Sequence, residues 1–322
     1  MWIDSDAKIR KRALLAGLSP GEKFLFTVVI LFILGLGFQL MGAFIAAWIY
    51  GFSINDILSL ESFDDPDYVA ASKLIQILGS VGTFIIPAFL FSFLFTGDIF
   101  SYYRFSSRAG GGGILLVIAM MVSIIPFINY LAELNMNIEV SSSRIDRILR
   151  ALENEAEQIM RAFTATRSIG GLLVNLLMIG IIASVGEELI FRGLVQRLLG
   201  ELLRNPHVAI MVTAVFFSAF HFQFFSFIPR FVLGVILGYL MYLGGSIWFP
   251  IMAHFVNNTM GVIYYYFNSR GSSDDMLEEI GTSAMMPMAA VISLFLFAFF
   301  FILWVYQLRT GTGVYPSSGT RR

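Results

Sequence analysis

The sequence predicts an all-α fold, a polytopic transmembrane bundle of about eight membrane-spanning helices. Two observations predict this class. Of the 322 residues, 57% are hydrophobic and only 13% are charged, whereas a soluble domain carries roughly 25% charged residues. Apolar runs long enough to cross a bilayer also recur along the chain. A soluble protein of this size cannot bury so much apolar surface, so the excess must contact lipid.

Eight apolar runs are candidates for spanning helices. A span needs about 20 mostly apolar residues, and a helix satisfies its own backbone hydrogen bonds inside lipid. The sixth run is short, so counts of seven or nine also agree with the sequence. The runs are residues 24–50, 74–96, 114–134, 168–185, 208–228, 231–245, 247–267 and 287–307.

The composition also excludes several classes of protein. The net charge of −1 provides no basic surface for a nucleic acid. The absence of cysteine excludes disulfide bonds, a thiolate nucleophile and a cysteine-ligated zinc site. We therefore expect a single integral membrane domain over residues 1–322, with the lipid bilayer as its surroundings and no nucleic-acid partner.

The orientation of the bundle follows from its Lys and Arg residues, which favour the cytoplasmic side of a membrane. If both termini are cytoplasmic, the inner segments hold 13 of the 21 Lys and Arg residues. We therefore expect cytoplasmic N- and C-termini.

One long polar insert, residues 135–167, separates the third and fourth runs. Between Arg144 and Phe163 its apolar residues recur at helical spacing, with Asp, Glu and Arg between them. The serines just before this stretch can cap a helix. We expect an amphipathic helix on the external side, resting on the bundle or the lipid surface. A lid over a substrate entrance is the alternative.

Ionisable residues inside membrane spans are costly and mark functional sites. At the inner end of the fourth run, Glu187 and Glu188 are followed by Arg192. Glu188 and Arg192 are four residues apart, so they can pair on one face of a helix. Glu187 is rotated by about 100° from Glu188 around the helix axis, and its carboxylate is free to act elsewhere.

Two of the three histidines lie inside predicted spans, His221 in the fifth run and His254 in the seventh. Asn258 shares a helix face with His254, whereas His207 begins a helix and is expected outside the site. A glutamate and a histidine that converge on one water form a base or a metal site. A histidine and an asparagine can donate hydrogen bonds to an oxyanion. We expect Glu187, His221, His254 and Asn258 to meet in one cavity within the membrane.

The ordered motifs resemble those of the CPBP family, the CAAX prenyl endopeptidase and Abi-type intramembrane proteases. The resemblance covers residues 168–267, about a third of the chain. The motifs are Glu187-Glu188-x-x-x-Arg192, Phe217-x-x-x-His221 and His254-x-x-x-Asn258.

The resemblance implies an intramembrane endopeptidase that hydrolyses a peptide bond of a membrane-bound peptide or protein. Glu187 would activate a water that His221 helps to hold, and His254 and Asn258 would stabilise the oxyanion. Glu188 and Arg192 would fix the helix end. The long insert resembles that of some bacterial members, which implies a location in the bacterial plasma (inner) membrane.

Two mechanisms agree with these residues. Glu187, His221 and His254 would be the ligands of a zinc ion, if one is bound, because carboxylate and imidazole are zinc ligands. The chain lacks the His-Glu-x-x-His motif, in which a separate glutamate transfers the proton. With Glu187 as a ligand, only Glu188 would remain as a base. We therefore favour a glutamate-activated water with no required cofactor.

A protein of a different class is the alternative. The polar residues could line the path of a non-catalytic membrane transporter, or belong to an immunity or partner-binding scaffold. Replacement of Glu187 separates these functions, because an enzyme loses its product whereas a scaffold keeps its partner.

Overall fold

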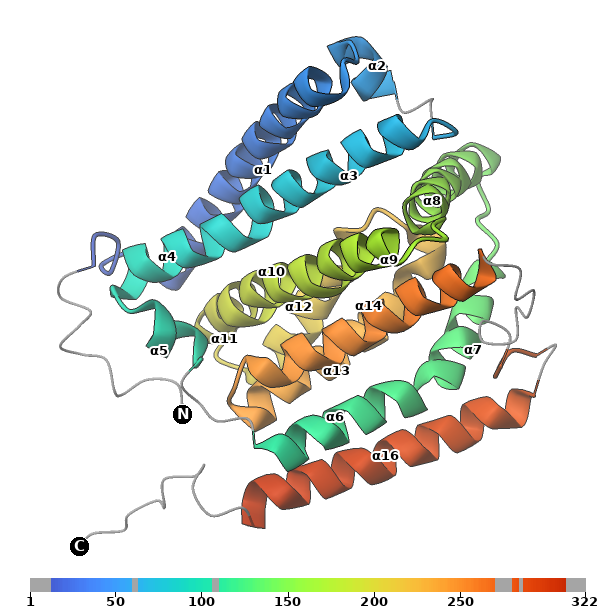
Figure 1. Cartoon of the computed structure of the whole chain (residues 1–322). Coiled ribbons are helices and arrows are strands. Elements are labelled where there is room, and N and C mark those ends of the chain that lie inside the picture. Colours follow the sequence, from blue (N-terminus) through green and yellow to red (C-terminus); the bar gives the residue numbers. More distant parts are fainter. Residues whose placement is uncertain (1–12, 60–62, 106–109, 270–279, 284–285, 311–322) are drawn as a thin grey trace, which may run out of the picture.

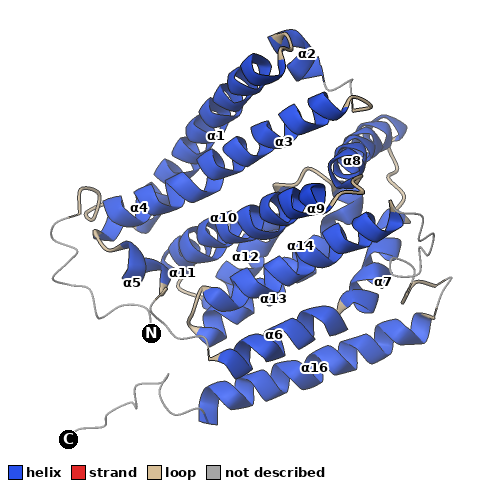
Figure 2. Ribbon diagram, viewed as in Figure 1, coloured by secondary structure: helices blue, strands red, loops and turns tan. Residues whose placement is uncertain are grey.

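The computed structural model describes residues 13–59, 63–105, 110–269, 280–283 and 286–310. Within these residues all regular structure is helical and no strand is present (Figure 2). The all-α fold predicted from the sequence is therefore confirmed.

The long helices form a bundle in which three groups lie side by side (Figure 1). On one side, α1 (Pro20–Tyr50) packs along the continuous run of α3 (Pro66–Ser80), η2 (Val81–Ile85) and α4 (Ile86–Thr96). On the other side, α16 (Pro287–Thr310) packs against α6 (Gly111–Ser123) and α7 (Ile125–Met136). Between them lie the helices that carry the candidate site.

The central group begins with one continuous helical run. It consists of α9 (Ile169–Asn175), η3 (Leu176–Ala183), α10 (Ser184–Glu188), η4 (Leu189–Val195) and α11 (Gln196–Leu203). The chain then forms α12 (Pro206–Ala219), the short η5 (Phe224–Ser226), α13 (Phe227–Gly244) and α14 (Trp248–Asn268). Two short helices, α2 (Ile54–Ser59) and α5 (Ile99–Tyr103), join longer ones.

Each of the eight predicted runs coincides with a helix or a helical run in the described chain. By length and composition, five of these are able to cross a membrane, and α6 with α7, bent by 41°, makes a sixth. The α12 helix is apolar, but its 14 residues are fewer than a span needs. The α14 helix has 21 residues and is long enough to cross a membrane, but its histidine and asparagines make it less apolar than the candidate spans. The described start of α1 and the end of α16 lie at the same end of the bundle (Figure 1).

Two of the predicted boundaries that differ from the structure affect the site. The fourth run does not end at residue 185, because the helix continues without interruption to Leu203. Glu187 and Glu188 therefore lie in the middle of a helix rather than at its end. The fifth run does not extend to residue 228, because α12 ends at Ala219. His221 consequently lies in the turn after α12 rather than inside a helix.

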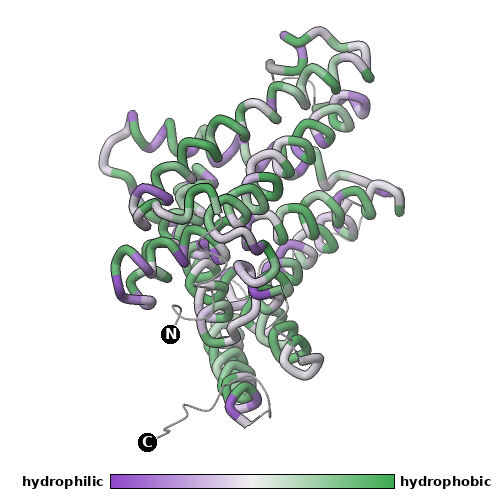
Figure 3. Tube along the Cα trace, turned by 90° about the vertical axis from the view of Figure 1, so that its left-hand side faces the viewer, coloured by the Kyte–Doolittle hydropathy of each residue, from purple (hydrophilic) through white to green (hydrophobic). Residues whose placement is uncertain are grey.

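Apolar side chains cover the outside of the bundle as well as its interior. Hydrophobic residues dominate along the lengths of the helices (Figure 3). On α1, Phe32 is 73% exposed and Trp48 is 85% exposed, and on α16 Phe295 is 72% exposed. Exposed aromatic side chains of this size are suited to contact with lipid rather than water. The protein is an integral membrane protein.

The predicted amphipathic helix is present as α8 (Ser143–Thr164) and lies at one end of the bundle (Figure 1). Ser142 caps it, since its hydroxyl accepts a hydrogen bond from the Ile145 amide. The helix contacts η5, α14, α3 and α9. Ile145 and Ile148 are exposed on its outer side, whereas Glu153 is buried against the bundle.

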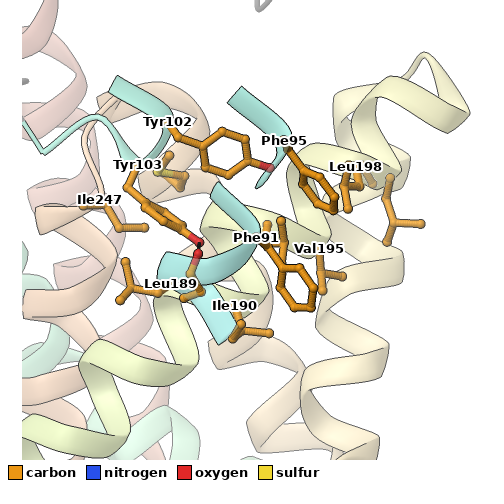
Figure 4. Close-up of a cluster of buried hydrophobic side chains, with 14 of the residues drawn as sticks. Phe91, Phe95, Tyr102, Tyr103, Leu189, Ile190, Val195, Leu198 and Ile247 are labelled. Atoms are coloured by element: carbon orange, nitrogen blue, oxygen red, sulfur yellow. Dashed lines mark hydrogen bonds between the residues drawn. The ribbon is translucent and has the colours of Figure 1, made fainter. Parts of the chain in front are cut away.

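A cluster of buried apolar side chains holds the long central helix against α4 and α5 (Figure 4). Phe91 and Phe95 of α4 and Tyr103 of α5 pack against Leu189 and Ile190, which directly follow the two glutamates. Burial raises the pKa of the Tyr103 phenol well above its ordinary value, so the hydroxyl stays protonated and donates a hydrogen bond to the Ala88 carbonyl at 2.6 Å. This packing fixes the helix that carries Glu187 and Glu188.

Candidate active site

The helix that carries the two glutamates is irregular on both sides of them. The α10 segment lies between two π-helical stretches, η3 and η4. Such stretches shift the rotation of the residues that follow and occur frequently at functional sites. Two side chains bind backbone carbonyls of η3. The Ser184 hydroxyl donates to the Gly180 carbonyl, and the Asn258 side-chain amide donates to the Ile179 carbonyl.

A buried ion pair joins Glu188 to Arg192. The Arg192 Nη1 donates to the Glu188 Oε1 at 2.8 Å, and both side chains are fully buried. The Arg192 Nη2 donates to the Gly234 carbonyl of α13 at 3.2 Å, and its guanidinium carbon lies 4.4 Å from the centre of the Phe217 ring. The pairing expected from the spacing of four residues is present, and it is needed because an unpaired buried charge is strongly destabilising.

The same carboxylate oxygen orients His254. The His254 Nδ1 lies 2.8 Å from the Glu188 Oε1. A glutamate paired with arginine is ionised and can only accept, so Nδ1 carries the hydrogen. The opposite ring nitrogen, Nε2, then lies 3.9 Å from the Glu187 Oε2. Glu188 therefore directs the free nitrogen of His254 toward the neighbouring glutamate.

Glu187 has a different environment from Glu188. Its side chain is 14% exposed, and its Oε2 is buried with no hydrogen-bond partner among the described residues. A buried polar atom without a partner is rare and needs an explanation such as a bound water or a catalytic role. The Glu188 Oε2 also lacks a partner, but its Oε1 is bound by Arg192 and His254. Glu187 is thus the carboxylate that remains available for chemistry.

His221 lies in the turn after α12, near Glu187 and His254. Its Nδ1 lies 2.8 Å from the Phe217 carbonyl, which can only accept, so Nδ1 is protonated and Nε2 of the neutral ring is an acceptor. His221 is close enough to Glu187 and His254 to interact electrostatically with both. The Phe217 ring contacts both imidazoles: its centre lies 5.3 Å from that of the His221 ring and 5.7 Å from that of the His254 ring.

Asn258 lies one helical turn beyond His254 and binds the central helix. Its Nδ2 donates to the Ile179 carbonyl at 2.9 Å, and its Oδ1 accepts from Asn257. One of its two amide hydrogens is therefore engaged, and the second is left for another acceptor. His207 lies elsewhere, with its Nδ1 3.0 Å from the Tyr239 hydroxyl and its ring against Tyr242.

Arg230, in the first turn of α13, is a further polar residue of this region. Its Nη2 donates to the Gln223 Oε1 at 2.6 Å, and its Nη1 is buried without a partner among the described residues. It interacts electrostatically with Glu187 and His221. The sequence analysis missed this residue, because the predicted boundaries placed it in a loop. An arginine inside an apolar helix was the signal that could have found it.

The donor groups are not arranged as a metal site. In the described part of the chain, no three His, Asp or Glu side chains form a group that could hold a metal ion. The Glu188 carboxylate, which is closest to His254, is already bound to Arg192. The side chains of Glu187, His221 and His254 are therefore not grouped as the ligands of one metal ion in this structure.

We predict that Arg192→Ala lowers the free energy of unfolding by about 3–5 kcal/mol, because it leaves the Glu188 carboxylate buried without its cation. Arg161→Ala is the matched control. Arg161 also pairs with a glutamate four residues before it, but both of those side chains are exposed, and such pairs contribute roughly 1 kcal/mol or less. Denaturation of the detergent-solubilised variants measures both values, and equal losses would contradict the buried pair as a source of stability.

Comparisons with known proteins agree with the motifs. Residues 169–260 match the family model described as type II CAAX prenyl endopeptidase Rce1-like. A protein of Escherichia coli, named as an uncharacterized 24.3 kDa protein, is 26% identical over 119 residues, which are 36% of this chain and 55% of that protein. The chain thus matches about half the length of this relative. No solved structure matches the chain.

The matched segment contains all the predicted site residues, from Glu187 on α10 to Asn258 on α14. The resemblance seen in the three motifs is therefore confirmed over residues 169–260, which match the Rce1-like family model.

Proposed function

We propose that this protein is an intramembrane endopeptidase that hydrolyses a peptide bond of a membrane-bound peptide or protein, with Glu187 as the base that activates water. One observation carries the proposal. The buried, unpartnered Oε2 of Glu187 lies 3.9 Å from the Nε2 of His254. A single water can bridge two atoms at this separation with ordinary hydrogen bonds, which is the arrangement that a water-activating base requires.

The reaction follows from the groups around this water. Glu187 takes one proton from the water while the oxygen forms a bond to the peptide carbonyl carbon. The neutral Nε2 of His221 accepts a hydrogen bond from the other O–H of the water, which stays on the attacking oxygen, and so holds the water in place. Glu187 then returns its proton to the peptide nitrogen, the C–N bond breaks, and an acid and an amine are released.

The negative oxygen of the tetrahedral intermediate needs hydrogen-bond donors. His254 donates from Nε2 when both of its nitrogens are protonated, and the Glu188 carboxylate balances that positive charge, because Glu187 is itself protonated at this stage. The second amide hydrogen of Asn258 is the other proposed donor. Glu188 and Arg192 take no part in the bond changes and instead fix the ring of His254.

The proposed mechanism uses no metal ion. The donor set is not grouped as zinc ligands would be, and the Glu188 carboxylate is committed to Arg192 and His254. A carboxylate base therefore carries the water activation that a metal would otherwise supply.

We also propose a location in the bacterial plasma (inner) membrane with cytoplasmic N- and C-termini. The distribution of Lys and Arg supports this orientation. Part of that signal, at residues 8–12, 108 and 321–322, lies outside the described residues.

We predict that Glu187→Gln abolishes cleavage in a protein that remains folded, because the amide cannot accept a proton from water. The measurement compares membranes that contain the wild type, Glu187→Gln or the control Glu201→Gln, and searches for peptides with new termini. Glu201 lies on the same helical run but pairs with Arg197 away from the cluster. New termini that are present with the wild type and Glu201→Gln, and absent with Glu187→Gln, support the proposal. Equal peptide sets in all three would favour a non-catalytic scaffold or transporter.

The second prediction concerns metal dependence. We expect the purified active protein to carry far less than one metal ion per chain and to retain its activity in the presence of a chelator. Elemental analysis and a chelator titration measure this. Stoichiometric zinc, whose removal stops cleavage and whose return restores it, would overturn the metal-free mechanism.

A further inference from the structure

The amphipathic helix α8 contacts the site region through a buried carboxylate. Glu153 accepts hydrogen bonds from the Phe225 amide at 3.0 Å, from the Gln223 amide side chain at 3.3 Å and from the Ser226 hydroxyl. All three donors lie within five residues after His221. Arg150 of the same helix adds a contact, with its guanidinium carbon 4.3 Å from the centre of the Phe225 ring.

Glu153 differs from the other acidic residues of α8. Four residues later on the same helix, Glu157 is half exposed and pairs with Arg161. Glu153 is 8% exposed, and its carboxylate accepts hydrogen bonds from the segment 223–226. A buried carboxylate that finds its donors on another part of the chain fixes the position of that part.

Other side chains hold the same segment. The Asn135 amide donates to the Phe224 carbonyl at 3.0 Å and accepts from the Ile228 amide at 2.6 Å. The Ser218 hydroxyl donates to the Phe227 carbonyl at 2.7 Å. The turn between α12 and α13 is therefore tied at both of its ends, by Glu153 of α8 and by Asn135 in the last turn of α7.

The turn needs such support because its backbone is strained. Phe222, directly after His221, has a φ of 54°, a conformation that a bulky residue rarely adopts and that persists only when the surroundings impose it. The His221 amide donates to the Ser218 carbonyl at the end of α12, and no further turn of α12 follows it. Its Nδ1 is bound to the Phe217 carbonyl on the α12 side, so the position of Nε2 depends both on this hydrogen bond and on how firmly the following residues are held.

Gln223 connects the same carboxylate to Arg230. Its amide nitrogen donates to Glu153 while its amide oxygen accepts from the Arg230 Nη2. Arg230 lies near Glu187, with its buried Nη1 unpartnered among the described residues. One contact from α8 thus fixes the turn of His221 and orients the arginine at the start of the next helix.

We propose that Glu153 is a positioning residue, through which the amphipathic helix α8 holds the His221 turn in its reactive geometry. The inference rests on the proposed function, since it assigns the insert a role in the same site. It differs from a lid over the entrance, because a lid would act on substrate binding whereas Glu153 acts on the geometry of the water.

The test compares Glu153→Ala with the matched control Glu157→Ala, which removes an exposed carboxylate from the same helix. Two quantities are measured in detergent-purified protein. Hydrogen exchange of the amides in residues 222–228 reports on the turn and needs no turnover. The kcat and KM for a synthetic peptide that spans a cleavage site found in the membrane comparison report on catalysis.

We expect Glu153→Ala to accelerate exchange of the Phe225 amide and to lower kcat by roughly 10- to 100-fold, the range expected from a small displacement of a catalytic group. KM should stay within about twofold of the wild-type value, and Glu157→Ala should change neither quantity. Ser226→Ala and Gln223→Ala remove single donors from the other side of the contact, and should give smaller changes in the same direction even if Glu153→Ala does not fold.

Several outcomes would overturn the proposal. Wild-type exchange in all the variants would show that Glu153 does not hold the turn. A raised KM with an unchanged kcat would assign α8 to substrate entry instead. Failure of the proposed function gives a different result, because cleavage would then survive Glu187→Gln while the exchange data would still report on Glu153.

Discussion

The candidate site depends on one buried carboxylate, that of Glu188. Its Oε1 accepts from both Arg192 and His254 at 2.8 Å, while Arg192 also binds the Gly234 carbonyl of α13. Three elements of the central group, the long glutamate helix, α13 and α14, are thus joined at one point. Buried ion pairs are costly to desolvate, and they persist where each charged atom has partners and where the arrangement specifies one structure. Here the arrangement specifies the direction in which the imidazole of His254 points.

The two adjacent glutamates have separate tasks because a helix turns by about 100° per residue. Glu188 is fully buried, and its Oε1 is bound by Arg192 and His254. Glu187 is 14% exposed, and its Oε2 has no hydrogen-bond partner among the described residues. A carboxylate bound to an arginine accepts a proton less easily than one without such a cation. The difference between the residues therefore arises from their rotation on one helix and not from their chemistry, which is identical.

The sequence predicts those features that depend on neighbours along the chain. The helical class follows from composition, the Glu188–Arg192 pair from a spacing of four residues, and α8 with its serine cap from local periodicity. Contacts between distant residues could not be predicted in this way. His254 is 66 residues from Glu188, and Glu153 is 72 residues from Phe225. The short turn after Ala219 contains mostly apolar residues, so hydropathy alone extends the predicted helix through His221 and leaves Arg230 in a loop.

The central claim, that Glu188 fixes the ring of His254 with Nε2 toward Glu187, has a direct test. The chain has three histidines, so a protein with ¹⁵N-labelled histidine gives a simple imidazole spectrum. We expect one ring, assigned by His254→Gln, to carry a hydrogen on Nδ1 and to lose that preference in Glu188→Gln, while the His207 and His221 signals stay unchanged. A His254 ring with an unprotonated Nδ1 in the wild type, or one that does not respond to Glu188→Gln, would contradict the account.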